Sequence, residues 1–406
     1  MSPGLKPLEE YREMVWNCAR CNWCKSVWGW YMKSWRFSEL CPSSAHYKFD
    51  AYSAQGRMDI SRALIEGDMD YEDSERLIDI AYRCTSCGAC QINCMRLQEK
   101  QPAEVIEALR AELVERGMVV SEHRAYLEST LKYGNPFEVP KKERLRWMEG
   151  LEFEVKDLTK ESGEVLLYLG CMYSLESRLR DTTKVFAQIL DIAGIDFGIL
   201  GAEERCCGSE QLRIGERGLF EALAEENIKR FNGLGIKTLV TPCPHGYYTF
   251  KFRYSKVGEL NFEVLHFSQY LKWLIDNGRI ELGEVSSQVV TYSDPCNLGR
   301  WAGEYEAPRE VLKGVRGIEF REMERNRDQA WCCGAGGGVL AAYPDFATWT
   351  AEERVAEAES SGCSVLVTAC PWCEYNLEDG IERRRSKIKL FNIAEIVFQA
   401  MKKSQK

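Results

Sequence analysis

The sequence predicts an α/β protein in which a helical N-terminal domain precedes two duplicated α/β domains. Three observations lead to this architecture. Seventeen of the 18 cysteines in the 406-residue chain fall into four spaced groups. The spacing of apolar residues changes near Gly163 from a helical pattern to short apolar runs. The third and fourth cysteine groups repeat each other at an interval of 125 to 127 residues, which indicates a duplicated domain because solenoid repeats are much shorter.

Helices are expected through the first third of the chain. Residues 60–84 mix apolar and charged residues at helical spacing, and residues 103–117 place Ile, Leu and Val three and four positions apart. We therefore assign residues 1–125 to the helical domain. The charged stretch 126–162 shows no strong core signal and is interpreted as a linker.

Beyond Gly163, short apolar runs alternate with stretches of helical pattern. The runs predicted to be strands are VLLYLG (165–170), TLVTPC (238–243), VVTYS (289–293) and VLVTAC (365–370). The helical stretches include 216–232, 262–277 and 351–361. This alternation is typical of β-α units with a parallel sheet. We divide it into two domains, 163–282 and 283–406.

The two α/β domains place cysteines directly after their predicted strands. Both copies contain Cys-Cys-Gly, at 206–208 and 332–334, and Cys-Pro, at 243–244 and 370–371. In open α/β sheets, ligands bind at the carboxyl ends of the strands. We therefore expect the thiols of these groups to converge on a crevice.

The composition limits the classes of function. Hydrophobic residues at 45 % and charged residues at 28 % indicate a globular protein, and a net charge of −9 argues against a nucleic-acid-binding or anionic-membrane surface spread over the whole molecule. The N-terminus has acidic residues where a signal peptide carries its apolar run, and no stretch of eighteen apolar residues occurs. A cytoplasmic protein without a transmembrane segment is expected, and in that reducing compartment thiols are better explained as metal ligands than as disulfides.

The first two cysteine groups have the spacing of iron–sulfur ligands. Each contains a Cys-x2-Cys-x2-Cys run, which wraps three thiolates around one face of a cubane [4Fe–4S] cluster, whereas zinc sites usually present separate cysteine pairs. In two-cluster ferredoxins, the fourth cysteine of one run ligates the other cluster. We therefore expect two cubane clusters with crossed ligand sets: Cys18, Cys21, Cys24 and Cys94 for one, and Cys84, Cys87, Cys90 and Cys41 for the other.

Five of the eleven tryptophans lie in the first 35 residues, most of them in the insert between Cys24 and Cys41. Tryptophan both shields clusters from water and anchors interfaces. Because an apolar shell is expected around any cluster, we interpret these side chains as a small core around the cofactor and keep a docking surface as the alternative.

The third and fourth groups resemble the paired CCG domains of heterodisulfide reductase. Two cubane motifs followed by two CCG domains resemble its D subunit, in which C-like and B-like parts are fused, over roughly residues 15–400. SDPCNLGR (293–300), WCCGAGGG (331–338) and TACPWC (368–373) resemble the family's second domain. The resemblance implies that five cysteines hold a non-cubane [4Fe–4S] cluster: Cys296, Cys332, Cys333, Cys370 and Cys373. Glycines 334 and 336–338 are expected to let the backbone approach this cluster.

The first CCG copy departs from the family pattern because Gly246 stands in the place of the fifth cysteine. Four thiols remain as candidate metal ligands: Cys171, Cys206, Cys207 and Cys243. They could hold a cubane cluster or a tetrahedral zinc ion, or the site could be degenerate. His245 is a candidate fifth ligand or a hydrogen-bonded neighbour. Cys363 lies outside the groups and is expected to be an ordinary thiol.

With several clusters in one chain, we expect an iron–sulfur electron-transfer subunit of a multi-subunit anaerobic oxidoreductase. No nicotinamide or flavin fingerprint occurs, so electrons are expected to come from partner redox subunits carrying flavin or iron–sulfur groups. The resemblance leaves two alternatives: a catalytic disulfide reductase subunit, and the iron–sulfur subunit of a glycolate, lactate or glycerol-3-phosphate oxidising complex. The Trp-rich stretch most resembles the D subunit of class II benzoyl-CoA reductase. A structural zinc protein without a redox role is a further alternative.

Overall fold

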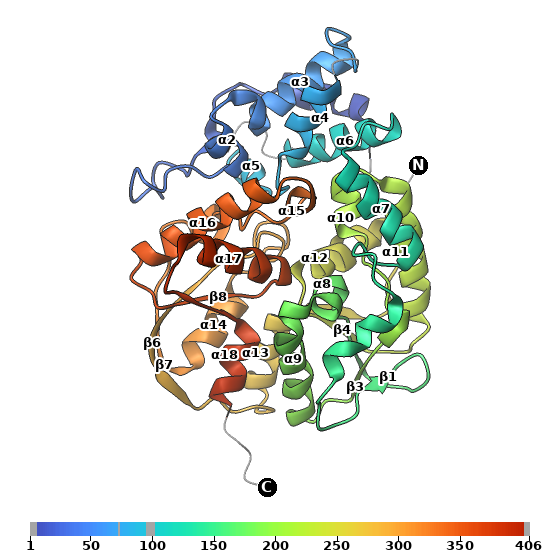
Figure 1. Cartoon of the computed structure of the whole chain (residues 1–406), viewed down its shortest axis with the longest axis vertical. Coiled ribbons are helices and arrows are strands. Elements are labelled where there is room, and N and C mark those ends of the chain that lie inside the picture. Colours follow the sequence, from blue (N-terminus) through green and yellow to red (C-terminus); the bar gives the residue numbers. More distant parts are fainter. Residues whose placement is uncertain (1–5, 72–73, 95–101, 402–406) are drawn as a thin grey trace.

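The computed structural model describes residues 6–71, 74–94 and 102–401. The N-terminal part of the chain is helical, as predicted, and Figure 1 shows its helices lying across the top of both α/β domains. Its elements are η1 (Leu8–Tyr11), α1 (Arg12–Trp16), η2 (Trp23–Lys25), α2 (Pro42–Tyr47), η3 (Asp50–Tyr52), α3 (Ala54–Glu66), α4 (Ser74–Tyr82), α5 (Ala89–Ile92), α6 (Pro102–Glu115), α7 (Ser121–Tyr133) and η4 (Lys141–Met148).

The first α/β domain is built on a five-stranded parallel sheet. Its strands are β1 (Lys156–Asp157), β2 (Val165–Leu167), β3 (Phe197–Ile199), β4 (Thr238–Thr241) and β5 (Glu263–His266), in the order β1-β3-β2-β4-β5. Its helices are α8 (Gly170–Leu175), α9 (Arg180–Ile192), α10 (Ser209–Ile214), α11 (Arg217–Asn232), α12 (Pro244–Tyr248) and α13 (Phe267–Asp276). The helix predicted over 262–277 is shorter than expected, because Glu263–His266 pairs in parallel with β4.

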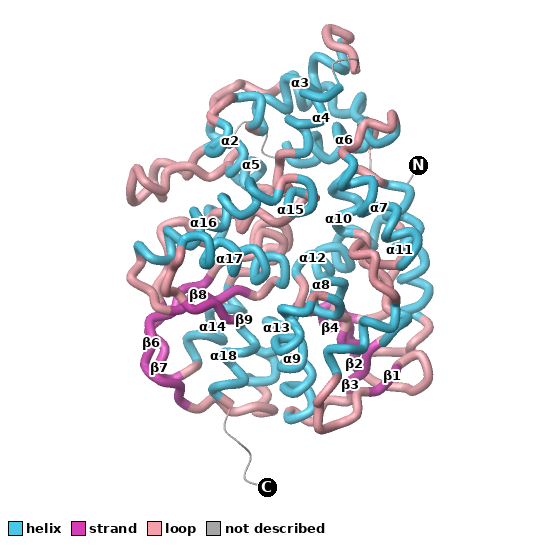
Figure 2. Tube along the Cα trace, viewed as in Figure 1, coloured by secondary structure: helices cyan, strands magenta, loops and turns pink. Residues whose placement is uncertain are grey.

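The second α/β domain repeats this topology. Strands β6 (Glu284–Tyr292), β7 (Arg316–Phe320), β8 (Val365–Thr368) and β9 (Lys389–Asn392) are parallel in the order β7-β6-β8-β9, which matches β3-β2-β4-β5 of the first sheet. The helices are α14 (Glu306–Gly314), α15 (Val339–Ala342), α16 (Pro344–Ser360), α17 (Pro371–Arg384) and α18 (Ile393–Ala400). The two sheets of Figure 2 therefore confirm the predicted α/β class and the duplication.

A single hydrophobic core joins the two repeats. It combines side chains of both sheets, such as Val240 and Val367, with those of the helices between them, such as Phe186 of α9 and Ile396 of α18. Such a shared core fixes the relative position of the two repeats, and with it the relative position of the cysteines that follow their strands. In the described part of the chain, no helix has the length and apolar run needed to cross a bilayer.

The segment predicted as a linker contributes to this core. Trp147 of η4 is fully buried in it, and the neighbouring Arg144 is buried as well. The sequence pattern did not indicate this because the few apolar residues of this segment, Leu145, Trp147 and Met148, stand among charged ones without a clear period. The domain boundaries themselves stay a prediction.

Replacing Trp147 with alanine should destabilise the protein strongly. Loss of a fully buried Trp side chain costs about 3–5 kcal/mol, whereas the matched change Trp273→Ala removes an exposed side chain and should cost less than about 1 kcal/mol. Thermal unfolding of both variants under anoxia measures the difference. Equal unfolding temperatures would contradict a structural role for residues 141–148.

Candidate metal centres

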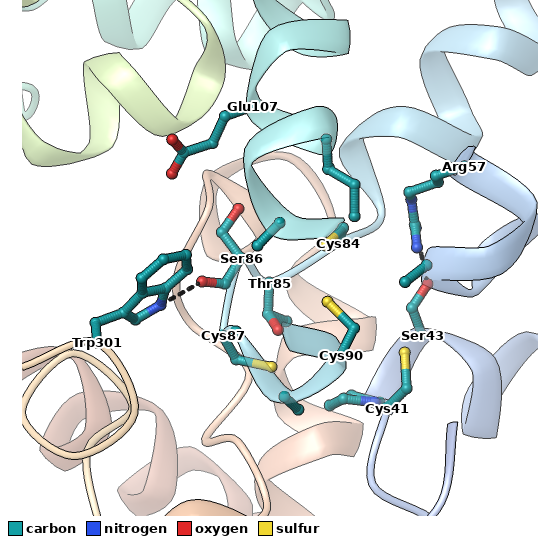
Figure 3. Close-up of a pocket in the computed structure, with 16 residues that line it drawn as sticks. Cys41, Ser43, Arg57, Cys84, Thr85, Ser86, Cys87, Cys90, Glu107 and Trp301 are labelled. Atoms are coloured by element: carbon teal, nitrogen blue, oxygen red, sulfur yellow. Dashed lines mark hydrogen bonds between the residues drawn. The ribbon is translucent and has the colours of Figure 1, made fainter. Parts of the chain in front are cut away.

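Four cysteines from two separate segments line one cavity beneath the N-terminal helices. Cys41 is the N-cap of α2, Cys84 and Cys87 lie in the loop after α4, and Cys90 belongs to α5. Together they line a cavity of about 490 Å³, and Figure 3 shows the thiols around it. We call this the inner centre (Cys41, Cys84, Cys87 and Cys90).

A second cavity of about 410 Å³ lies next to the inner centre. It is lined by the other four N-terminal cysteines, which we call the outer centre (Cys18, Cys21, Cys24 and Cys94). Ala54, the first residue of α3, lines both cavities. The structure thus brings each Cys-x2-Cys-x2-Cys run together with the fourth cysteine of the other run, in the grouping that the ferredoxin pattern predicts.

Four buried arginines surround the loop of the inner centre. Each donates to a different backbone carbonyl of that loop: Arg57 to Arg83 at 2.9 Å, Arg110 to Cys84 at 2.6 Å, Arg213 to Ser86 at 2.7 Å and Arg300 to Cys87 at 2.8 Å. Among the described residues, none of the four has a carboxylate within ion-pair distance. Burial lowers the pKa of the Arg110 guanidinium from its usual value.

A buried cation without an anionic partner is costly. A cluster held by four thiolates carries negative charge and would supply an anionic partner beside the loop that these arginines contact, in a cavity that Arg57 lines. The donor set and its surroundings therefore fit an anionic iron–sulfur cluster at the inner centre.

Burial also sets the protonation of the free thiols. It raises the pKa of Cys24 to about 11 and that of Cys41 to about 12. Both are therefore neutral thiols at physiological pH without metal. Because a metal ligand must be a thiolate, cluster assembly at these residues releases protons.

The five cysteines of the second CCG domain converge at the carboxyl end of the second sheet, and we call them the second CCG centre (Cys296, Cys332, Cys333, Cys370 and Cys373). Cys370 is the N-cap of α17, and Cys373 lies in its first turn. The sulfurs of Cys333 and Cys373 are 3.1 Å apart, and Cys332 is hydrogen-bonded to Cys296 and Cys333.

The glycines after Cys333 allow close contacts between parts of the protein: a Cβ on Gly334 would meet the Ala347 carbonyl at 2.5 Å, and one on Gly337 would meet the Cys84 carbonyl at 2.7 Å. Both have positive φ. The glycine run therefore brings the second CCG domain against the loop of the inner centre. The approach of these glycines to a cluster stays a prediction.

The first CCG domain gathers its four cysteines as well, and we call them the first CCG centre (Cys171, Cys206, Cys207 and Cys243). They line a cavity of about 390 Å³ together with His245 and Gly246. The buried Arg144 donates to Cys171 Sγ at 3.2 Å and to the buried Glu204 at 2.9 Å. A Cβ at Gly246 would meet its nearest neighbour, Thr241 Oγ1, at 3.4 Å.

His245 is held away from solvent by two contacts. Its Nδ1 lies 2.9 Å from Glu210 Oε1, and both side chains are buried. Its ring stacks on that of Trp372, with centroids 5.8 Å apart. Glu210 in turn accepts a hydrogen bond from the Gly338 amide of the second CCG domain.

Contacts connect the four centres in turn. The outer and inner centres share Ala54. Cys87 and Cys332 belong to one buried cluster, which joins the inner centre to the second CCG centre. Trp372, between the last two cysteines of the second CCG centre, also lines the cavity of the first CCG centre. Of the 18 cysteines, all of them within the described ranges, Cys21 of the outer centre is the one that is exposed.

Within the described ranges, no group of three His, Cys, Asp or Glu side chains is spaced to hold a single metal ion. The thiolates of a four-iron cluster bind different irons and stand farther apart than the ligands of one ion.

Two features differ from the sequence-based interpretation or were missed by it. The interpretation of the early tryptophans as a core is wrong, because Trp16, Trp23, Trp30 and Trp35 are exposed. The buried arginines were not predicted at all, since an arginine that will be buried has the same sequence signature as one on a solvated face.

Comparisons with known proteins agree with this arrangement. The family model of the CCG cysteine-rich domain matches residues 165–251 and 290–378. The chain is 31 % identical over 392 residues to the D subunit of the dihydromethanophenazine:CoB–CoM heterodisulfide reductase of Methanosarcina barkeri, covering 95 % of this chain and 93 % of that protein. It is 32 % identical over 340 residues to the EtfAB:quinone oxidoreductase of Syntrophomonas wolfei, covering 78 % of this chain and 46 % of that protein.

A third relative is the probable iron–sulfur-binding oxidoreductase FadF of Bacillus subtilis. The two sequences are 32 % identical over 79 % of this chain. The match covers 46 % of the relative, so this chain spans about half of that protein's length. Among solved structures, a hypothetical protein from Helicobacter pylori superposes with a TM-score of 0.48 at 11 % identity, over 75 % of this chain and 58 % of that one.

Single cysteine replacements test the crossed ligand sets. Cys94→Ser should remove the spectroscopic signal of the cluster held by Cys18, Cys21 and Cys24, and Cys41→Ser that of the cluster held by Cys84, Cys87 and Cys90, each with a loss of about four irons per chain. Cys363→Ser, which changes a thiol outside all four centres, is the control. Iron analysis and EPR of the reduced proteins provide the readout. If each replacement instead removed the signal of its own run, the crossed assignment would be wrong.

Proposed function

This chain belongs to the family of heterodisulfide reductase D subunits, and we propose that within its complex it relays electrons through four iron–sulfur centres in series. Iron–sulfur clusters accept and release single electrons. The residues of this chain would hold the clusters, limit the access of water to the inner and CCG centres and fix the distances between the four centres. The relay would begin at the outer centre and end at the two CCG centres.

The connected series of thiol groups is the observation that carries this proposal. Neighbouring centres touch through Ala54, through the contact between Cys87 and Cys332, and through Trp372. The exposed thiol of Cys21 lies at one end of the series, and the cysteines of the other three centres are buried or partly buried. In such an arrangement, electrons would enter at the exposed outer centre and pass to centres that are less accessible to oxidants in solvent.

We assign two cubane [4Fe–4S] clusters to the outer and inner centres and a non-cubane [4Fe–4S] cluster to the second CCG centre. At the first CCG centre, we assign a four-iron cluster in preference to zinc. Two features favour it. Cys206 and Cys207 are adjacent, whereas ligands of one zinc ion are typically two to four residues apart, and the cavity is of similar size to that of the outer centre, about 390 against 410 Å³.

Disulfide reduction by this chain alone is the less favoured alternative. In the family that the chain resembles, the disulfide is cleaved between two complete non-cubane clusters, and Gly246 leaves the first set one thiol short. A Cβ atom at Gly246 would make ordinary contacts. The fifth thiol is therefore missing because of the residue type at this position, and the backbone itself leaves room for a Cβ. An assay of the reduced protein with disulfide substrates should show no turnover.

The partners are expected to be redox subunits with flavin or iron–sulfur groups on the donor side and a catalytic subunit on the acceptor side. The D subunit of class II benzoyl-CoA reductase stays the specific prediction, drawn from the Trp-rich stretch. Purification under anoxia with identification of the bound subunits tests it.

The relay predicts that electrons reach the second CCG centre through the inner centre. In stopped-flow reduction by a pre-reduced ferredoxin, which is too large to approach a buried centre, Cys41→Ser should slow the appearance of the second CCG centre's EPR signal by at least about tenfold, an added barrier of about 1.4 kcal/mol. Cys363→Ser should react as the wild type does. An unchanged rate in Cys41→Ser would mean that electrons bypass the inner centre.

A further inference from the structure

An exposed aromatic surface begins at the outer centre, where the exposed Trp23 stands between Cys21 and Cys24 in the sequence. Among the described residues, six of the eleven exposed large hydrophobic side chains lie between positions 16 and 49, and the other five are scattered. The most exposed is Trp35, at 84 %, followed by Phe49 at 64 % and Trp30 at 61 %. Exposed aromatic patches of this kind mark interaction sites.

Most of this surface is carried by a hairpin formed by residues 23–41, which we call the aromatic hairpin. Backbone hydrogen bonds close its base, from the Val27 amide to Ser38 at 2.8 Å and from the Leu40 amide to Lys25 at 2.7 Å. Val27 and Leu40 are buried beneath it. In Figure 1 the hairpin is the dark blue loop that projects from the body near α16.

The tryptophans of the aromatic hairpin are already packed in a fixed arrangement. Trp28 and Trp30 meet edge to face with ring centroids 4.3 Å apart, and Trp23 lies 6.1 Å from Trp28. The Trp28 amide is also tied to the second CCG domain through Gln329, at 3.3 Å. A preorganised aromatic surface loses little conformational entropy on binding, which is why Trp and Tyr dominate interface hot spots.

Basic residues outnumber acidic ones on the hairpin, which carries Lys25, Lys33 and Arg36 against Glu39, and Lys25 is paired with Asp50. Residues 14–38 contain four basic residues and no acidic one, in a chain with a net charge of −9. Arg20 and Arg36 pair with Asp59 and Glu353, but the arginine side chains remain more exposed than their partners, 52 % against 34 % and 54 % against 21 %. Lys33, exposed on the hairpin, has no carboxylate partner among the described residues.

We propose that the aromatic hairpin is the docking surface for an acidic one-electron carrier protein, which exchanges electrons with the outer centre beside the exposed Cys21. The proposal rests on the relay function. Aromatic and arginine side chains are enriched in the cores of protein–protein interfaces, and the hairpin carries both kinds with a single acidic residue, Glu39. The basic charges complement an acidic partner and would guide it to the one centre with an exposed cysteine.

An anionic lipid surface is the competing occupant, since Trp and Lys also favour membrane interfaces. A protein carrier is favoured for two reasons. The surface lies beside a proposed redox centre. Its tryptophans also pack against one another, which gives a fixed shape that suits the defined surface of a protein better than a fluid bilayer.

The test measures electron transfer under anoxia from two forms of one donor: a reduced acidic ferredoxin, and the same ferredoxin with its surface carboxylates amidated. The acidic form should reduce the outer centre faster, by about tenfold at low salt, and the advantage should disappear as salt screens the charges. The double change Trp30→Ala/Trp35→Ala and the single change Lys33→Glu should each remove most of this advantage. Trp273→Ala, an exposed tryptophan on α13, is the matched control and should react as the wild type does.

Methyl viologen, a small donor that needs no docking surface, separates this proposal from the relay. It should reduce the wild type and all variants at equal rates. If viologen reduces the outer centre but no electron reaches the second CCG centre, the relay fails independently of the docking result. Equal rates for the two ferredoxins, or unchanged ferredoxin rates in the hairpin variants, would overturn the docking proposal. Co-sedimentation of the wild type, but not of the tryptophan variant, with phosphatidylglycerol vesicles would assign the surface to lipid instead.

Discussion

The rest of the structure depends on buried positive charge that the protein itself does not neutralise. Arg57, Arg110, Arg213 and Arg300 come from all three domains and converge on one loop, residues 83–87. Desolvating four guanidiniums without ion-paired carboxylates is unfavourable unless an anion lies close to them. An anionic cluster at the inner centre would stabilise these arginines, and with them the contacts between the N-terminal helices and both CCG domains.

The duplication explains why one centre is complete and the other is altered. Both repeats place cysteines after equivalent strands, in the order that a shared topology imposes. The second copy keeps five thiols and contacts the inner centre through Cys332 and its glycine run. The first copy has four thiols and places Arg144 on Cys171 and His245 on Trp372. The copy with the full set of five is the one whose Cys332 packs with Cys87 of the inner centre.

Much of this architecture could be predicted from the sequence because it depends on local spacing. The helix over 103–117, the strands at 165–170 and 365–370, and the duplication all follow from periodicity and from cysteine intervals, and the structure confirms them. What the sequence did not reveal depends on contacts between distant segments. Trp147 enters the core of a different domain, β5 forms only because β4 lies beside it, and the early tryptophans point to solvent instead of to the cofactor. Spacing identifies which cysteines can act together, but it does not identify which cations will be buried around them.

Thiolates from distant segments are proposed to hold iron in a connected series of four centres. The most direct measurement is an anomalous difference map at the iron edge from crystals grown without oxygen. We expect iron density within each of the four cysteine groups: the outer, inner, second CCG and first CCG centres. The density at the inner centre is the decisive observation, because the buried arginines beside it call for an anion there. A map without iron among Cys41, Cys84, Cys87 and Cys90 would contradict the proposed series, because the inner centre connects the outer centre to the second CCG centre.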